Sequence, residues 1–340
     1  YYHYGIELKR KTVNFNIAFN TPEGLEIKKT PDVMEKLDLF LSSGENSKAL
    51  SASAINSYLD CPLQFYLTRV EGIKEMDELQ ETVEDSTFGT IFHAVMEYLY
   101  EPFTGRVISS EDFENLLKDS LNIDRKIHKA FAVHYFKKPE ENIRLEGNNL
   151  LIARVIRKYV VQMLRTDKKY APFTYVSSED KRSISYPVFE GKKSVNIKGF
   201  IDRVDEKAGR IRIIDYKTGK GSLEFRSFND VFDANKENRP KYVLQTFLYG
   251  LLYKEKAGGR QMTPSIYYVR DIFKDNFETE LKYKPEKISE LVLNFSDYEE
   301  EFCSRLTVCL EDIFNPDIPF RQTENTKPCE YCPYKIICNR

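Results

Sequence analysis

The chain has 340 residues, of which 41% are hydrophobic and 31% are charged, and its formal net charge is −2. This composition is typical of a globular protein with a sizeable core. The charge argues against a protein that coats nucleic acid nonspecifically, although a local basic patch could still grip a few phosphates. No apolar run approaches the roughly 20 residues needed to span a bilayer, so we expect no membrane span.

The first half of the chain is predicted to be mainly helical. Residues 1–50 look peripheral, and we assign them to an N-terminal extension or to the end of a preceding domain, whereas residues 51–340 are expected to form one domain. Apolar residues at helical spacing, with serines able to cap the first segment, predict helices over residues 51–70, 87–101, 112–121 and 148–167. The region from about 102 to 170 is therefore interpreted as a helical insertion.

Strands dominate the pattern after residue 180. Three consecutive segments, residues 183–191, 194–205 and 210–220, read as neighbouring strands joined by tight turns. They are followed by a helix that ends at paired glycines, one more strand, a helical segment and a cysteine-rich tail, over residues 241–258, 264–270, 284–312 and 321–340. This order of elements predicts an α/β core in which helices flank a sheet.

Charged side chains stand at the ends of two of these apolar strands. Asp202 ends one strand in the sequence GFID, and Asp215 lies near the end of the next strand in IIDYK. Two carboxylates on neighbouring strands repel each other unless a cation lies between them, and oxygen ligands suit Mg²⁺ or Mn²⁺. Lys217 falls on the same face as Asp215, where its ammonium could orient a water molecule and offset charge on a phosphate. The alternative is a surface ion pair at a strand end.

Two predicted helices carry polar residues four positions apart, which places both members of each pair on one helix face. His93 and Glu97 form the first pair, and Gln245 and Tyr249 form the second. Taken alone, a histidine among apolar residues is typical of a core histidine, and the glutamine–tyrosine pair is typical of packing and solvation. Beside the Asp–Lys pattern, both pairs become candidates for the same site.

Four stretches together, GTIFHAVME, GFIDRVD, IIDYKTGK and QTFLYGLLY, resemble the motifs of the PD-(D/E)XK nuclease superfamily, in order and in spacing. The resemblance covers roughly residues 51–340 and is strongest to the nuclease domains of the RecB/AddB kind. It implies a restriction-endonuclease-like core, with a mixed central sheet flanked by helices. It also implies a metal-dependent hydrolysis of DNA phosphodiesters with Mg²⁺ or Mn²⁺ as the cofactor.

The resemblance assigns roles to individual residues of this chain. The metal ligands would be His93, Asp202, Asp215 and the main-chain carbonyl of Tyr216. The catalytic set would comprise the two aspartates together with Lys217, Gln245 and Tyr249. The second acidic position holds Asp rather than Glu, which the family permits, so the catalytic set is complete.

Four of the six cysteines form a separate pattern. Cys329, Cys332 and Cys338 make a C-x2-C-x5-C cluster in the tail, and Cys61 is the best fourth candidate, 268 positions before Cys329 (329 − 61). Zinc is one interpretation, because C-x2-C is a common zinc half-site, but the chain has no second C-x-x-C. Cysteine thiolates are also the usual ligands of cubane iron–sulfur clusters. Cys303 and Cys309 are interpreted as packing residues.

One cysteine before the nuclease motifs and three after them resemble the 4Fe–4S staple of AddB-type nucleases and of nucleases in CRISPR spacer acquisition. The resemblance implies that Cys61, Cys329, Cys332 and Cys338 hold such a cluster, which closes a long loop as a crosslink does. Because oxygen could destroy the cluster, we expect a reducing, cytoplasmic location.

We expect DNA to be the partner of this domain. Lys220 lies in a glycine-containing loop beside the predicted metal site, where backbone N–H groups could approach a phosphate, and Arg203 is assigned to DNA contact as well. The resemblance implies an exonuclease acting on single- or double-stranded DNA ends, as the nuclease module of an AddAB/RecBCD-like helicase–nuclease in double-strand break repair. No Walker A motif is present, so a helicase motor would lie on another part of the protein or on another subunit.

Two other functions stay open at this point. The chain could be a freestanding exonuclease similar to the CRISPR adaptation enzymes, or a non-catalytic scaffold that keeps the fold and binds DNA ends. A zinc-stabilised scaffold is a third interpretation. Metal-dependent cleavage separates the enzymes from the DNA-end-binding scaffold, and the metal content of the purified protein separates iron from zinc.

Overall fold

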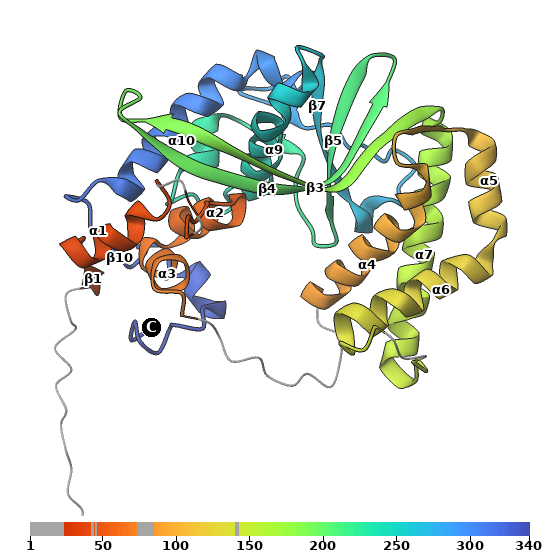
Figure 1. The fold of residues 1–340 in the computed structure, drawn as a ribbon, viewed down its shortest axis with the longest axis horizontal. Coiled ribbons are helices and arrows are strands. Elements are labelled where there is room, and N and C mark those ends of the chain that lie inside the picture. Colours follow the sequence, from red (N-terminus) through yellow and green to blue (C-terminus); the bar gives the residue numbers. More distant parts are fainter. Residues whose placement is uncertain (1–23, 42–43, 45, 74–84, 140–142) are drawn as a thin grey trace, which may run out of the picture.

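A mixed five-stranded sheet forms the centre of the protein (Figure 1). The computed structural model describes residues 24–340 apart from 42–43, 45, 74–84 and 140–142. The strand order is β2-β3-β4-β5-β7, with bounds Arg106–Ile108, Phe173–Val188, Lys193–Lys207, Arg210–Lys217 and Met262–Tyr268. Neighbouring strands are antiparallel except β5 and β7, which are parallel. The predicted α/β fold with a mixed central sheet is therefore confirmed.

Helices cover both faces of this sheet. One face is covered by α2, α9 and α10 (Ala52–Asp60, Lys241–Ala257 and Glu299–Phe314), and the other by α4 and α7 (Asp85–Tyr100 and Gly147–Tyr170). Side chains of β5 alternate between the two cores, because successive residues of a strand point to opposite faces. Ile211 and Ile213 pack in the first core, whereas Ile214 and Tyr216 pack in the second.

The order of strands follows from short turns and one crossover. The hairpin between β4 and β5 closes on Ala208 and Gly209, which have φ of 51° and 75°, as two-residue hairpin turns require. Parallel strands need a longer connection, usually helical, and α9 is the helix in the segment that joins β5 to β7. The tight turn and the crossover bring the end of β5 and the start of α9 to the same end of the sheet.

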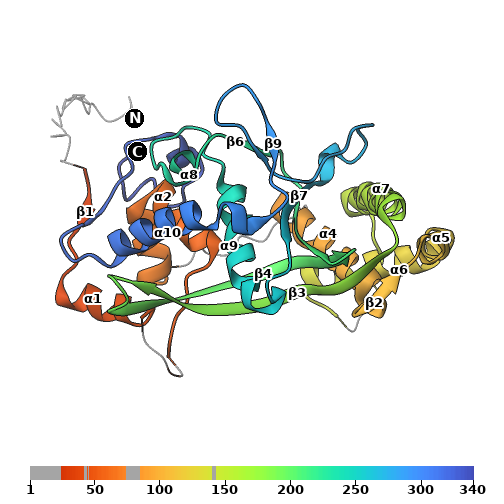
Figure 2. The same cartoon turned by 90° about the horizontal axis from the view of Figure 1, so that it is seen from above.

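The remaining elements surround the sheet at its two ends. They are the helices α1, α3, α5, α6 and α8 (Pro31–Asp38, Pro62–Phe65, Ser110–Lys118, Ser120–Ala130 and Phe228–Phe232) and the two-residue strands β1, β6, β8, β9 and β10 (Glu26–Ile27, Glu224–Phe225, Lys282–Tyr283, Glu290–Leu291 and Phe320–Arg321). Figures 1 and 2 both show α4 to α7 gathered at one end of the hairpin β3–β4, and α1 to α3 with the C-terminal tail at the other. None of the described helices is long and apolar enough to cross a membrane.

Several predicted boundaries differ from the structure. The helix expected over 51–70 is interrupted at Cys61, where the backbone is extended (φ −163°, ψ 107°) and Pro62 disfavours helix in the residue before it. The insertion also contains the strand β2, which pairs with β3. In the segment 284–312, predicted to be helical, only the part from Glu299 onward forms a regular α-helix, and β9 pairs with β8 before it.

The described part of the N-terminal region packs on the same core as the sheet. Val33 and Leu37 of α1, with Phe40 after it, belong to the core that α9 and α10 cover. β1 pairs with β10, which joins this region to the segment that precedes the cysteine-rich tail. Residues 1–23 lie outside the described residues, and the domain boundary at residue 51 stays a prediction.

Candidate functional site

Asp215 lies near the end of β5, as predicted, whereas Asp202 does not end its strand, because β4 continues to Lys207. Asp215 is fully buried, and Asp202 is 11% exposed at its side chain. Burial raises the pKa of each carboxyl group to about 6, although the neighbouring Lys217 opposes the shift. Asp202 Oδ2 accepts a hydrogen bond of 2.7 Å from the backbone N–H of Tyr216, so the two strands are held in a fixed relation.

Lys217 pairs with Asp215 on the face of β5 that α9 covers. Its Nζ donates to Asp215 Oδ1 at 2.7 Å and lies 2.5 Å from Oδ2. Burial lowers the pKa of Lys217, but the Asp215 and Asp202 carboxylates outweigh that effect and raise it above its ordinary value. Lys217 therefore stays charged, and Asp215 Oδ2 accepts no hydrogen bond within the described part of the chain.

His93 reaches the same place from α4. Its Nε2 lies 3.0 Å from the carbonyl oxygen of Tyr216, and its Nδ1 lies 3.5 Å from Asp202 Oδ2. Burial lowers the pKa of His93 to about 4, against the opposing effect of Asp215. The imidazole is therefore neutral at pH 7, which is the form that binds a metal ion.

Glu179 is part of the site although the sequence did not predict it. His93, Glu179 and Asp202 each have one potential ligand atom within 4.8 Å of the corresponding atoms of the other two. Glu179 lies on β3 between Ser178, which pairs with Arg203, and Asp180, which pairs with Ile201, so it stands opposite Asp202. Asp215 falls outside this group because Lys217 occupies its carboxylate.

Gln245 and Tyr249 face the carboxylates from α9. Gln245 Nε2 donates to the Tyr249 hydroxyl at 2.7 Å. Burial raises the pKa of Tyr249, and the Asp215 and Asp202 carboxylates add to this shift. Gly199 permits this approach, because a Cβ at residue 199 would lie 3.0 Å from a ring carbon of Tyr249 and 2.7 Å from Cδ1 of Leu252, both on α9. The glycine of the GFID motif thus lets α9 lie against β4.

A cleft of about 490 Å³ opens onto these residues. Its walls include His93, Glu97, Glu179, Tyr216 and Lys217. A second cleft lies beside it and shares Tyr242; it is lined by basic residues, among them Lys220, Arg226 and Lys241. Lys217, His93 and Tyr216 are therefore accessible from a cleft that lies next to a basic groove.

The residues of the first cleft fit a hard divalent ion. They offer carboxylates, a neutral imidazole and the carbonyl of Tyr216, which is a donor set suited to Mg²⁺ or Mn²⁺. The Glu179 carboxylate makes neither a hydrogen bond nor an ion pair with any described residue. Acceptor atoms left in this state are what a cation at this position would satisfy.

Mn²⁺ binding to the chain is expected to weaken as the pH falls from 7 to 5. The pKa values of about 6 mean that Asp202 and Asp215 take up protons in this range. For each proton that the metal must displace, the affinity for the metal falls roughly tenfold with every unit that the pH drops. Titrations of Mn²⁺ by electron paramagnetic resonance at pH 5, 6 and 7 measure this slope. Asp215→Asn should make the slope shallower, and an affinity that does not change with pH would contradict the account.

The prediction that Arg203 contacts DNA is wrong. Arg203 is 1% exposed and lies in the opposite core, where its Nη1 is 2.6 Å from Asp167 Oδ2 and its Nη2 is 2.8 Å from Asp205 Oδ2. Nη1 also donates to the Tyr216 hydroxyl at 3.0 Å. Arg203 therefore supports the strand end beneath the site and joins it to α7. Lys220, by contrast, is exposed in the loop after β5.

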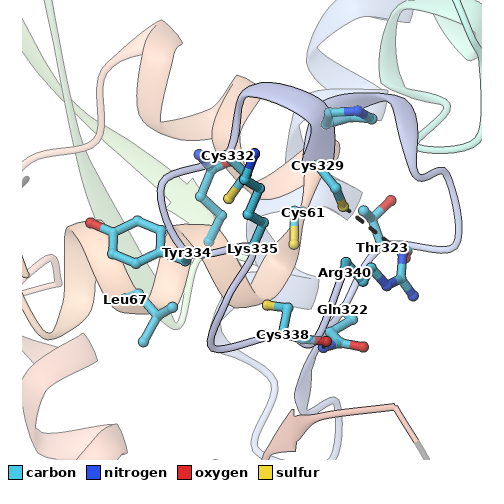
Figure 3. A pocket seen from close by; sticks show the side chains of 12 residues that line it. Cys61, Leu67, Gln322, Thr323, Cys329, Cys332, Tyr334, Lys335, Cys338 and Arg340 are labelled. Atoms are coloured by element: carbon cyan, nitrogen blue, oxygen red, sulfur yellow. Dashed lines mark hydrogen bonds between the residues drawn. The ribbon is translucent and has the colours of Figure 1, made fainter. Parts of the chain in front are cut away.

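The four cysteines of the predicted cluster line one pocket, although they come from opposite ends of the chain. Figure 3 shows the sulfur atoms of Cys61, Cys329, Cys332 and Cys338 arranged around it. All four belong to the described residues, and no three of the sulfurs lie within 4.8 Å of one another. Burial raises the pKa of Cys332 and Cys338, and the neighbouring cysteines add to the shift.

The backbone explains how Cys61 reaches the tail. Ser51 caps α2 by accepting a hydrogen bond from the N–H of Ala54, and α2 ends where Cys61 turns extended before Pro62. The tail is anchored nearby, because the Tyr334 hydroxyl donates to the carbonyl of Ile73 at 2.8 Å. The break that the sequence analysis missed is the feature that places Cys61 against the tail.

Comparison with known proteins agrees with this geometry. Residues 49–339 match the PD-(D/E)XK nuclease superfamily. The chain is 24% identical over 309 residues to a Streptococcus agalactiae serotype Ia protein named as a subunit of an ATP-dependent helicase/deoxyribonuclease, and the match covers 86% of this chain and 26% of that protein. Proteins with the same name from Carboxydothermus hydrogenoformans and Clostridium perfringens are 27% and 25% identical, over 52% and 57% of this chain and 17% of each relative.

The chain thus spans about a quarter or less of the length of these relatives. The family match, over residues 49–339, covers the five-stranded sheet, the helices from α2 to α10 and the candidate site, but not β1 and α1. The chain belongs to the PD-(D/E)XK nuclease superfamily.

Proposed function

We propose that this chain is a metal-dependent deoxyribonuclease, with residues 51–340 as the nuclease module, the region 102–170 as its insertion and the tail 321–340 as its cluster-binding segment. The observation that carries the proposal is the meeting of Asp202 of β4 with Asp215 and the charged Lys217 near the end of β5. Membership of a nuclease superfamily supports the same conclusion.

The residues of the site have separate roles in this proposal. Asp202, Asp215, His93 and the carbonyl of Tyr216 would hold a Mg²⁺ or Mn²⁺ ion. A bound ion of this kind lowers the pKa of water and polarises a phosphodiester. Lys217 places a buried positive charge where charge develops on the phosphate. The hydrogen bond between Gln245 and Tyr249 keeps both side chains turned toward the carboxylates.

Cys61, Cys329, Cys332 and Cys338 are proposed to hold a 4Fe–4S cluster with a structural role. All four cysteines line one pocket although they come from opposite ends of the chain, and cysteine thiolates are the usual ligands of such a cluster. A cluster would join α2 to the tail, and its sensitivity to oxygen supports a cytoplasmic location.

DNA and a helicase are the proposed partners. Lys220 and Arg226 are exposed on the groove next to the site and make no ion pair among the described residues, so they are available for phosphates. The relatives that match this chain are named as subunits of an ATP-dependent helicase/deoxyribonuclease. We therefore place this module in a helicase–nuclease of the AddAB/RecBCD kind that acts at double-strand breaks.

Digestion of linear and covalently closed circular DNA tests the exonuclease part of the proposal. With Mg²⁺ or Mn²⁺, the chain is expected to degrade linear single- or double-stranded DNA progressively from its ends and to leave circles intact. Cleavage of circles at the same rate would show an endonuclease. DNA that is bound but not cut would favour the non-catalytic scaffold, or a nuclease that works only with its motor.

A further inference from the structure

We propose that Glu179 is a further ligand of the divalent ion, together with His93 and Asp202. This inference rests on the proposed function, because it concerns the same metal site. It adds a residue that no motif of the sequence contains, from a strand, β3, to which no catalytic role was assigned. The site would then draw side chains from α4, β3, β4 and β5.

The distances within the group suit a single small cation. The three ligand atoms of His93, Glu179 and Asp202 lie within 4.8 Å of one another. Six ligands held about 2.1 Å from a Mg²⁺ ion lie about 3 to 4 Å apart, so a small inward movement of these side chains completes the geometry. Histidine and carboxylate donors together also suit Mn²⁺.

The backbone of β3 turns Glu179 into the site. Glu179 has φ of 44°, in the left-handed region that residues other than glycine and asparagine rarely adopt. The register of β3 against β4 also shifts between Tyr175 and Ser177. A conformation of this kind is strained and persists where surrounding structure enforces it. Here it sets a carboxylate opposite Asp202.

The charge balance around Glu179 calls for a cation. Its carboxylate is partly buried and makes no hydrogen bond or ion pair with any described residue. Asp202 and Glu97 lie near it as further carboxylates, and Lys217 is already bound to Asp215. A metal ion among carboxylates this close offsets their mutual repulsion, which otherwise favours their protonated forms.

Glu179→Gln tests the assignment, since glutamine keeps the size of the side chain and removes its charge. Mn²⁺ affinity is measured without DNA, by electron paramagnetic resonance, on the whole chain. The affinity is expected to fall roughly 10- to 100-fold, as for other residues that support a metal, while the melting temperature without metal does not fall. Glu97→Gln is the comparison variant, because Glu97 lines the same cleft but lies outside the group of three; its lost charge should cost far less affinity than Glu179→Gln.

The outcomes separate this inference from the proposed function. Wild-type affinity in Glu179→Gln, with binding lost in Asp202→Asn, would overturn the assignment of Glu179 alone. Equal losses in Glu179→Gln and Glu97→Gln would also overturn it, because they would show a general effect of charge in the cleft. A wild-type chain that binds no Mn²⁺ would overturn the proposed metal site and this inference with it.

Discussion

Replacing Lys217 with alanine is expected to slow DNA cleavage by roughly 100- to 1000-fold, as the loss of one preorganised electrostatic group does in other enzymes. Lys217 is held at the strand end by its pair with Asp215 and stays charged although it is buried. Removing its side chain takes away the positive charge next to the reacting phosphate but leaves the sheet and the cysteine pocket intact. Single-turnover cleavage of linear DNA at saturating Mg²⁺ measures the effect.

Lys254→Ala is the matched control for this experiment. Lys254 lies on α9, the helix of Gln245 and Tyr249, and its surface pair with Glu299 is mostly exposed on the lysine side, so its loss should cost little stability. Its cleavage rate should equal that of the wild type. A Lys217→Ala chain that cleaves at the wild-type rate would remove Lys217 from the mechanism.

Replacing Cys61 with serine is expected to lose iron and to lower the melting temperature by several degrees. Cys61 and Cys329 are 268 positions apart (329 − 61), and a crosslink across so long a loop stabilises a protein by roughly 4–5 kcal/mol through chain entropy. Iron content and visible absorbance of anaerobically purified protein report the cluster, and thermal unfolding reports the stability.

Cys303→Ser serves as the control for the cysteine experiment. Cys303 lies on α10, where its carbonyl accepts a hydrogen bond from the Tyr186 hydroxyl, and its sulfur is not among the pocket residues. This variant should keep its iron. If Cys61→Ser also keeps full iron and its melting temperature, Cys61 is not a ligand of the cluster. Zinc in place of iron in the wild type would overturn the cluster itself.

The sequence predicted the parts of the site that depend on local patterns. Asp202, Asp215 and Lys217 lie on neighbouring apolar strands joined by a short turn, and period-two alternation places the last two on one face. Only the prediction that Asp202 ends its strand was wrong, because β4 continues to Lys207. The structure brings these residues together. The i, i+4 relation between Gln245 and Tyr249 was enough to predict that they face the same way, and they are hydrogen-bonded.

The errors came from features that local patterns do not contain. Glu179 escaped notice because β3 begins at Phe173 rather than near residue 183, and because its positive φ breaks the alternation on which the prediction relied. Arg203 was misplaced although its signal was present: it follows Asp202 directly in a strand, so its side chain points to the opposite face. The short strand β9, within 284–312, depends on pairing with β8, which in turn pairs with β6, a strand distant in sequence.

Cleavage of linear DNA by this chain, with and without Mg²⁺ or Mn²⁺ and beside Asp215→Asn, tests the central claim most directly. The account predicts degradation by the wild type in the presence of either metal, none after chelation, and loss of activity in the variant. Equal cleavage by wild type and Asp215→Asn would contradict the site described here. Absence of cleavage by the wild type under every metal condition, with DNA still bound, would contradict the assignment of this chain as a self-sufficient nuclease.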